Sequence, residues 1–140
     1  MPTMTRVLVV ANRTADSDEL LAALLERHAQ GSISVTLLAP ARYEVTSPRG
    51  GKQAVLRRLR TAADRLREAG IETEAVVGDP DPFRAVEVIW NPERFDEVII
   101  CTLPERLSRW LRLDLPRRVG RLTGQHVRHV VAHERTLAHA

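Results

Sequence analysis

The sequence predicts an α/β fold with a five-stranded parallel sheet and helices on both faces. Five short β-branched or apolar runs alternate with segments whose apolar residues recur every three to four positions. The first run, residues 6–11, is apolar without interruption after its first residue, which is typical of a strand buried on both faces. Strands that alternate with helices form parallel sheets with right-handed crossovers. For this βαβαβαβαβ pattern we expect the strand order 3-2-1-4-5.

The expected strands are rich in β-branched residues and are bounded by turn residues. They cover residues 6–11, 32–39, 71–77, 96–101 and 126–132. Pro40 stops the second strand, because proline cannot donate a hydrogen bond to a sheet. Residues 41–51 then form a loop, and residues 133–140 form a short tail of a single domain that spans residues 1–140.

The expected helices carry apolar residues at three- and four-residue steps. They cover residues 19–26, 52–69, 82–90, 106–113 and 115–122. Gly31, Gly70 and Gly124 follow three of them, as is common at helix ends, so the first helix continues until Gly31. Asp81 followed by Pro82 is typical of a helix start, since aspartate caps free amides and proline fits the first helical position.

The composition indicates an ordinary globular protein. The chain has 140 residues, of which 44% are hydrophobic and 28% are charged. Cys101 is its single cysteine, so neither a disulfide framework nor a multi-thiolate zinc site is expected. No apolar run approaches the roughly 18 residues needed to span a bilayer, and the first residues do not resemble a signal peptide. We therefore expect a soluble, cytoplasmic protein that does not bind a membrane.

Basic residues are concentrated in the last part of the chain. Residues 1–100 carry 13 basic and 15 acidic side chains, whereas residues 101–140 carry 8 basic and 3 acidic side chains. Every basic residue except Lys52 is an arginine. The composition of the coding genome explains such a preference, unless the arginines gather at one place in the fold.

The expected binding cleft lies between strands 1 and 4. Parallel sheets bind ligands at the carboxyl ends of their strands, at the point where the strand order reverses. The candidate cleft residues are therefore those that follow these two strands, with the turn after strand 3 nearby. They are Ala11, Asn12, Arg13, Thr14, Gly78, Asp79, Cys101, Thr102, Leu103 and Pro104.

The residues at these strand ends resemble those of the universal stress protein family. The resemblance covers nearly the whole chain and includes the long helix 52–69. Its other elements are Val-Leu-Val-Val-Ala-Asn at 7–12, Val-Gly-Asp-Pro at 77–80, Asp-Glu-Val-Ile-Ile at 96–100 and Leu-Ser-Arg-Trp-Leu at 107–111. The resemblance implies a Rossmann-like five-stranded sheet, frequent dimerisation and, in some members, ATP binding.

The ATP-binding loop of the family is altered in this chain. ATP-binding members carry G-x2-G-x9-G-S/T after strand 4, where glycines let backbone amides surround the phosphates. At that spacing this sequence has Cys101, Pro104, Asp114 and Leu115. Pro104 removes an amide donor, and Asp114 is expected to place a carboxylate where a phosphate would bind. We therefore expect no ATP binding in the family's manner, although Asn12, at the family's strand-1 aspartate, could still bond the base of ATP or AMP.

Three arginines are spaced to share one face of the helix expected at 106–113. These are Arg106, Arg109 and Arg112, with Leu107, Trp110 and Leu111 on the opposite face. Arginine binds phosphate and carboxylate groups bidentately. This face, with Arg13 from strand 1, is therefore a candidate surface for an anion or a protein partner. A solvated amphipathic helix is the alternative interpretation.

Two further kinds of partner are not expected. Asp64 and Glu68 interrupt the arginines of helix 52–69, and none of the chain's aromatic residues is interleaved with them, which argues against nucleic acid. The late histidines do not predict a metal site, because His126 faces the opposite side of the fifth strand from His129 and His133, which lie about 13 Å apart.

The sequence leaves three functions open. We expect a non-catalytic regulatory or interaction module without a cofactor, which forms a homodimer through the edge strand His126–Ala132. The alternative is a nucleotide- or anion-binding sensor that uses the cleft between strands 1 and 4. Its candidate ligand contacts are Asn12, Arg13, Gly78 and Arg109.

The third possibility is a small hydrolase or transferase that acts through Cys101 or Asp79. A buried thiol and a turn residue explain these two side chains without catalysis. The state of the cleft distinguishes the first two functions. A cleft closed by Leu103 and Trp110 would favour interaction, whereas an open cleft lined by arginine would favour a ligand.

Overall fold

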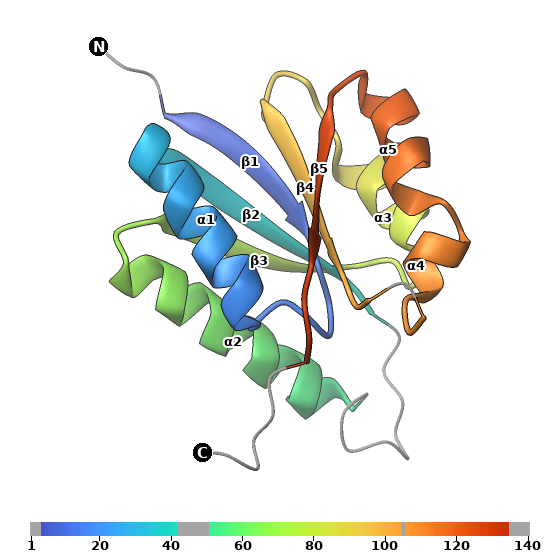
Figure 1. The fold of residues 1–140 in the computed structure, drawn as a ribbon, viewed down its shortest axis with the longest axis horizontal. Helices are drawn as coiled ribbons and strands as arrows, with labels where there is room; N and C mark the ends of the chain where they lie inside the picture. The colour runs from blue at the N-terminus through green and yellow to red at the C-terminus, as the bar shows by residue number, and fades with distance from the viewer. Residues whose placement is uncertain (1–3, 42–50, 105, 135–140) are drawn as a thin grey trace.

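A five-stranded, all-parallel sheet forms the centre of the fold (Figure 1). In a computed structural model, which describes residues 4–41, 51–104 and 106–134, its strands are β1 (Thr5–Val10), β2 (Ile33–Pro40), β3 (Glu72–Gly78), β4 (Glu97–Thr102) and β5 (Val127–Val131). The order is β3-β2-β1-β4-β5, so the predicted fold class and strand order are confirmed. Most of the predicted loop 41–51 and of the predicted tail 133–140 lies outside the described residues.

Helices cover both faces of the sheet, as the sequence predicts. They are α1 (Asp18–Gln30), α2 (Lys52–Glu68), α3 (Pro82–Ile89), α4 (Arg109–Arg112) and α5 (Leu115–Thr123). Figure 1 shows α1 and α2 on one side of the sheet and α3, α4 and α5 on the other. Alternate residues of β1 enter the two cores: Val7 and Val9 pack on the side of α1 and α2, and Leu8 and Val10 pack on the side of α3 and α5. None of the helices in the described part of the chain has the length and apolar character needed to cross a bilayer.

The helix predicted over 106–113 is wrong in its extent. Only Arg109–Arg112 is helical, and Ser108 begins it by accepting a hydrogen bond on its hydroxyl from the Leu111 amide over 3.2 Å. Before it, the Leu107 amide donates to the Pro104 carbonyl over 2.8 Å, so Arg106 and Leu107 form a turn. The predicted arginine face therefore does not exist as a continuous helical surface. Leu107, predicted on the apolar side, is 66% exposed.

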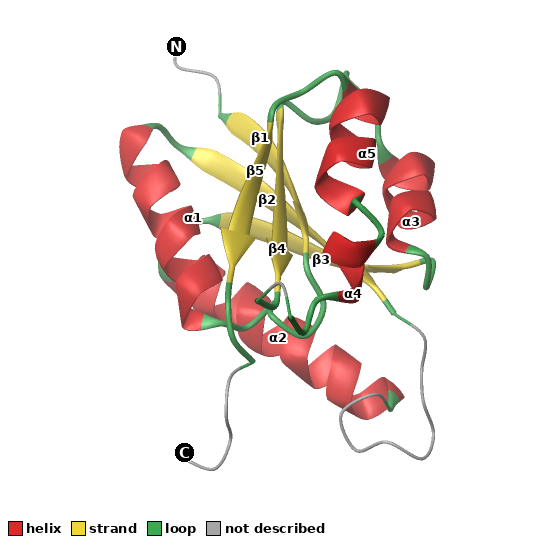
Figure 2. Ribbon diagram, turned by 45° about the vertical axis from the view of Figure 1, so that its right-hand side comes forward, coloured by secondary structure: helices red, strands yellow, loops and turns green. Residues whose placement is uncertain are grey.

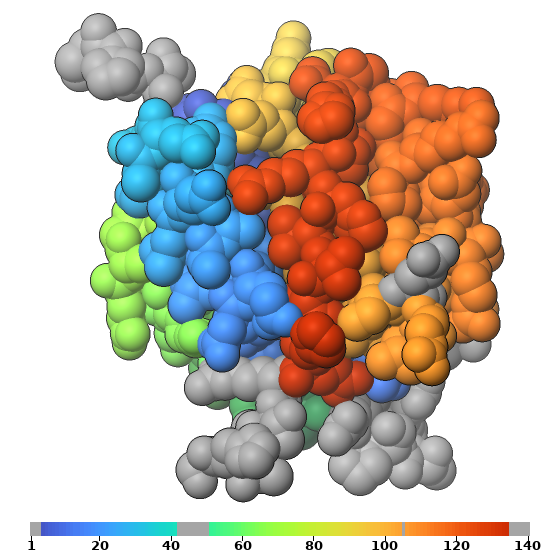
Figure 3. Space-filling view, in the orientation of Figure 1, coloured from blue at the N-terminus to red at the C-terminus, as the bar shows by residue number. Residues whose placement is uncertain are grey.

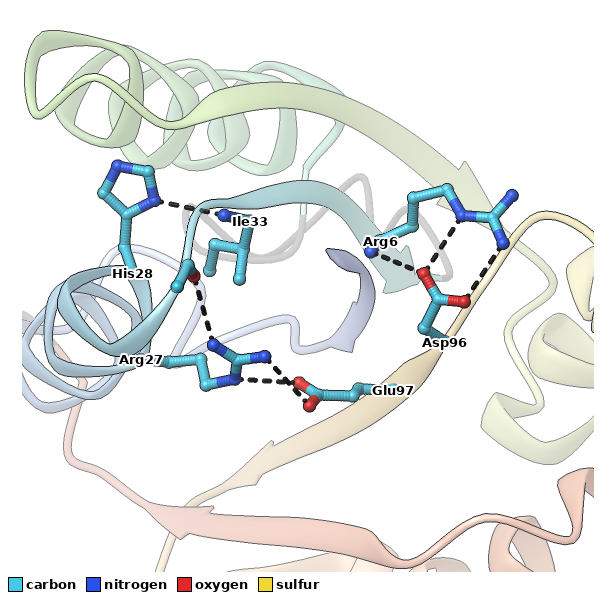
Figure 4. A network of polar contacts seen from close by, with 7 residues as sticks. Arg6, Arg27, His28, Ile33, Asp96 and Glu97 are labelled. Atoms are coloured by element: carbon cyan, nitrogen blue, oxygen red, sulfur yellow. Dashed lines mark hydrogen bonds and ion pairs between the residues drawn. The ribbon is translucent and has the colours of Figure 1, made fainter. Parts of the chain in front are cut away.

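Two arginines at the amino edge of the sheet are each neutralised by one carboxylate (Figure 4). Arg6 of β1 donates from Nε to Asp96 Oδ2 and from Nη2 to Asp96 Oδ1, both over 3.1 Å. Arg27 of α1 bonds both carboxylate oxygens of Glu97, again over 3.1 Å. Both pairs are bidentate, the strongest geometry for an arginine and a carboxylate. Each of these two arginines is therefore paired with a carboxylate of its own at the amino ends of the strands.

Candidate functional site

An open cavity of about 710 Å³ lies at the carboxyl ends of the central strands, where the strand order reverses. Val10 of β1 lies opposite Ile100 of β4 in the sheet, so the residues that follow the two strands emerge side by side. Figure 2 shows α4 beside these strand ends. The lining includes the predicted cleft residues Asn12, Arg13, Thr14, Cys101, Thr102, Leu103 and Arg109.

Four predicted site residues do not line this cavity: Ala11, Gly78, Asp79 and Pro104. Ala11 is fully buried in the core, and Gly78 lies at the end of β3 against Leu38 and Ala85. Asp79 serves its own turn: its Oδ1 accepts a hydrogen bond from the Asp81 amide over 2.9 Å, and its Oδ2 lies 3.6 Å from Arg84 Nε. The neighbouring Asp81 does line the cavity, and it also caps α3 by accepting from the Phe83 amide over 3.0 Å.

Asn12 connects β1 to the end of β2 and to α2. Its Nδ2 donates to the Pro40 carbonyl over 2.9 Å, and its Oδ1 accepts from Nη1 of Arg58 over 2.8 Å. Arg58, which the sequence did not single out for the cleft, is thus held in the cavity wall by an amide 46 positions away. The Asn12 amide thus bonds the end of β2 through its nitrogen and Arg58 through its oxygen.

Arg13 and Glu134 form an ion pair at the rim of the cavity. The two residues are 121 positions apart, and Arg13 Nη1 lies 3.3 Å from Glu134 Oε1. Both side chains are partly exposed, at 47% for Arg13 and 26% for Glu134. Arg13, which lines the cavity, is therefore already paired with a carboxylate of the same chain.

Arg109 and Arg118 reach the cavity from α4 and α5. The guanidinium of Arg118 lies over the Phe83 ring, 4.3 Å from its centre, a cation–π contact that orients it. Neither arginine has a carboxylate partner among residues 4–41, 51–104 and 106–134. Arg112, one helical turn after Arg109, does not line the cavity.

Cys101 is a buried thiol at the floor of the site. It is 1% exposed, and burial raises its pKa to about 11. Its backbone carbonyl accepts a hydrogen bond from the Thr14 hydroxyl over 3.2 Å. At neutral pH the thiol is protonated, so it is a poor nucleophile.

The adjacent Thr102 pairs with a histidine that the sequence did not connect to the cleft. Its Oγ1 lies 2.7 Å from Nε2 of His129 on β5, and burial lowers the pKa of that imidazole. Within the described chain, no second hydrogen bond orients the His129 ring. The described residues also contain no group of three His, Cys, Asp or Glu side chains that could hold a metal ion.

The backbone at the altered loop keeps one feature that glycine favours. Asp114 has φ 56° and ψ 39°, in the left-handed region, directly before α5. Aspartate is one of the few residues other than glycine found there. Its carboxylate makes no capping hydrogen bond to α5 and lies 3.7 Å from Nη1 of Arg117 instead. Asp114 therefore begins α5 as predicted, but its carboxylate does not bond the free amides of the helix as a phosphate would.

The strand order and the two helical layers together define a Rossmann-like α/β fold, with a cavity at the point where the strand order reverses. Within that class, the fold is that of the universal stress proteins. A universal stress protein in complex with cAMP is 22% identical, with a TM-score of 0.58 over 93% of this chain and 98% of that one. A universal stress protein from Archaeoglobus fulgidus is 14% identical, with a TM-score of 0.60 over 93% of this chain and 95% of that one.

A third solved structure, the Archaeoglobus fulgidus universal stress protein in complex with dAMP, is 15% identical, with a TM-score of 0.57 over 93% of this chain and 99% of that one. No protein-family model and no curated protein sequence matches the chain. At these identities the likeness concerns the fold, and the site has to be interpreted from its own residues.

Proposed function

We propose that this chain is a non-catalytic binding module for a small anionic ligand of the nucleoside monophosphate class. The observation that carries the proposal is the convergence of four arginines on one cavity from four places in the fold: Arg13, Arg58, Arg109 and Arg118. Among the described residues, the cavity lining contains one carboxylate, that of Asp81. Guanidinium groups are suited to phosphate because their planar forks bind it bidentately.

Apolar side chains complete the cavity on the side of α4. Trp110 and Leu113 line it, as do Leu103 and Leu107 before the helix. Leu107 and Leu113 are 66% and 44% exposed, so this side of the cavity offers accessible apolar surface to a ligand. A ligand with a flat apolar group and an anionic end would contact both the apolar side chains and the arginines of the cavity.

A monophosphate suits the site better than a triphosphate. The positions of the family's loop glycines are Cys101, Pro104 and Asp114, and Pro104 has no amide to donate. The site therefore offers side-chain cations in place of a continuous backbone cradle for a phosphate chain. Two of the solved neighbours hold cAMP and dAMP, each with a single phosphate.

Binding is preferred over catalysis because the candidate catalytic groups are poorly arranged. The Cys101 thiol is buried and protonated, and Asp79 lies outside the cavity in its own turn. The hydroxyl–imidazole pair of Thr102 and His129 has no third group to orient the ring in the part of the chain that the structure describes. A general base in a catalytic site is ordinarily oriented in this way.

Calorimetric titration with AMP and with ATP tests the proposal. We expect AMP to bind more tightly than ATP. Arg109→Gln should weaken AMP binding by about tenfold or more, since it removes a charge-assisted hydrogen bond in the cavity. Arg112→Gln, on the same short helix but outside the cavity, is the matched control and should bind as the wild type does. Undetectable AMP binding at millimolar concentration, or equal losses in the two variants, would overturn the proposal.

The edge strand β5 supports a second part of the proposal, a homodimer. In the described sheet β5 pairs with β4 alone, and Val131 at its end is 47% exposed. An edge strand with free backbone groups can pair with another chain. Sedimentation analysis of the wild type and of Val131→Lys tests this: a dimer that the substitution weakens supports the interface, and a monomer in both cases excludes it.

A further inference from the structure

Residues 132–134, which follow β5, cross the carboxyl ends of the strands and reach the cavity rim. The Ala132 amide donates to the Thr102 carbonyl over 2.8 Å, and Ala132 is fully buried. Glu19 Oε2 of α1 then accepts from the His133 amide over 3.0 Å and lies 2.8 Å from His133 Nδ1. In Figure 3 this red segment lies against the blue start of α1. Glu134, the next residue, contacts Arg13.

We propose that Glu134 is an internal counter-anion for Arg13, and that the anionic group of a bound ligand displaces it. This inference rests on the function proposed above and adds its regulation. A carboxylate on a lining arginine is the contact that a ligand anion would itself make. The chain thus holds a weak competitor for its own ligand, and the Glu134 carboxylate leaves Arg13 when the site is filled, which loosens the neighbouring His133.

The geometry of the pair makes displacement feasible. One nitrogen–oxygen contact at 3.3 Å joins two partly exposed side chains, in contrast to the bidentate Arg6–Asp96 and Arg27–Glu97 pairs at the other edge of the sheet. Single, partly exposed ion pairs contribute little free energy. A phosphate can replace this contact with two parallel hydrogen bonds to the same guanidinium.

The contacts on either side explain why Glu134 competes at all. Ala132 is fixed to β4, and His133 is held by Glu19, so Glu134 is kept within reach of Arg13. A tethered group acts at a high effective concentration, even when its intrinsic affinity is low. Through the same contacts, displacement of Glu134 by a ligand would also affect the end of the edge strand β5, which lies two residues before His133.

Calorimetry with AMP on the full chain tests the competition. Glu134→Gln should tighten AMP binding about two- to fivefold, because it removes an exposed ion-pair competitor of ordinary strength. Glu26→Gln on α1 removes the same charge from an exposed position away from the cavity, and it should leave the affinity unchanged. In an Arg13→Gln background, the Glu134→Gln substitution should have no further effect, since the two residues act as a pair.

A second measurement follows the segment itself. AMP should accelerate amide hydrogen exchange at His133, whose amide is hydrogen-bonded to Glu19 in this structure. If AMP binds wild type and Glu134→Gln equally and exchange at His133 does not change, the competition is refuted while the binding function stands. Equal tightening by Glu26→Gln would also refute it, because the effect would then be one of overall charge. If neither wild type nor Glu134→Gln binds AMP, the proposed function fails and this inference fails with it.

Discussion

Arg58 of α2 and Asn12 after β1 form a 2.8 Å hydrogen bond that joins a helix to the central strand of the sheet at the cavity wall. Arg58 lines the cavity from α2. The amide that holds Arg58 is itself fixed by the Pro40 carbonyl, so three segments meet at this point. The position of a cationic side chain in the site thus depends on a neutral one.

Replacing Asn12 by alanine should reduce both stability and AMP affinity. The variant loses the bonds to Pro40 and Arg58 and leaves a partly buried carbonyl unpaired, which costs about 1–3 kcal/mol in unfolding free energy. Arg58 also loses this hydrogen bond in the cavity wall. Urea unfolding and calorimetry measure the two effects. Gln125→Ala, at an exposed position after α5, is the control and should change neither.

Gly78→Ala should destabilise the fold because there is no space for a side chain at the end of β3. An added Cβ would lie 2.8 Å from Leu38 Cδ1 and 3.0 Å from the Ala85 Cβ, and Leu38 and Ala85 are both buried. Overpacking of this kind costs about 1–3 kcal/mol. Gly31→Ala is the matched substitution, since its φ of 166° is extended and its nearest neighbour, Arg27 Nη1, lies 3.7 Å away. Equal urea midpoints for the two variants would contradict this account of Gly78.

The Cys101 thiol should be inert in the native protein. Since burial raises its pKa to about 11, almost no thiolate is present at pH 8. A chromogenic disulfide reagent should label the native chain slowly and the chain in denaturant rapidly, with one thiol per chain. Rapid labelling under native conditions would show that the floor of the site opens readily.

The pair of Asp96 and Arg6 should make stability depend on acid pH. The hydrogen bond from the Arg6 side chain holds the pKa of Asp96 below its usual value. A depressed carboxyl pKa contributes stability above the unfolded-state pKa of about 3.9, and this stability is lost as the pH falls through the folded-state pKa. Urea midpoints should therefore fall between neutral pH and about pH 3. Asp96→Asn should show a smaller fall over the same interval, and an equal fall would refute the assignment.

The sequence predicts the sheet well because its signals are local. Uninterrupted apolar runs such as 7–11 and turn residues at their ends are enough to define strands, and alternation with helices determines parallel pairing. The helix at 106–113 was overextended because Leu107, Trp110 and Leu111 mimic helical spacing. The correct start had a local signal in Ser108, a residue type that caps helices.

The cavity was predicted less completely, because part of its wall comes from helix faces. Arg58 could have been found from its position three residues after Val55, which also lines the cavity, and Arg118 from its position three residues after the buried Leu115. The ion pair of Arg13 and Glu134 joins residues 121 positions apart. No sequence pattern indicates such a contact, since it depends on how the chain leaves β5.

The amino and carboxyl ends of the strands differ in how their described arginines are paired with carboxylates. This difference would affect an approaching ligand before it reaches the site. Arg6 and Arg27 are neutralised one-to-one at the amino edge, whereas Arg109 and Arg118 at the cavity have no carboxylate partner in the described chain. A cleft with excess positive charge concentrates diffusing anions and accelerates their capture. Added salt shortens the range of this attraction. For the anionic ligand proposed above, the unequal pairing of the described arginines would therefore steer encounters towards the carboxyl ends of the strands before any atom of the site is touched.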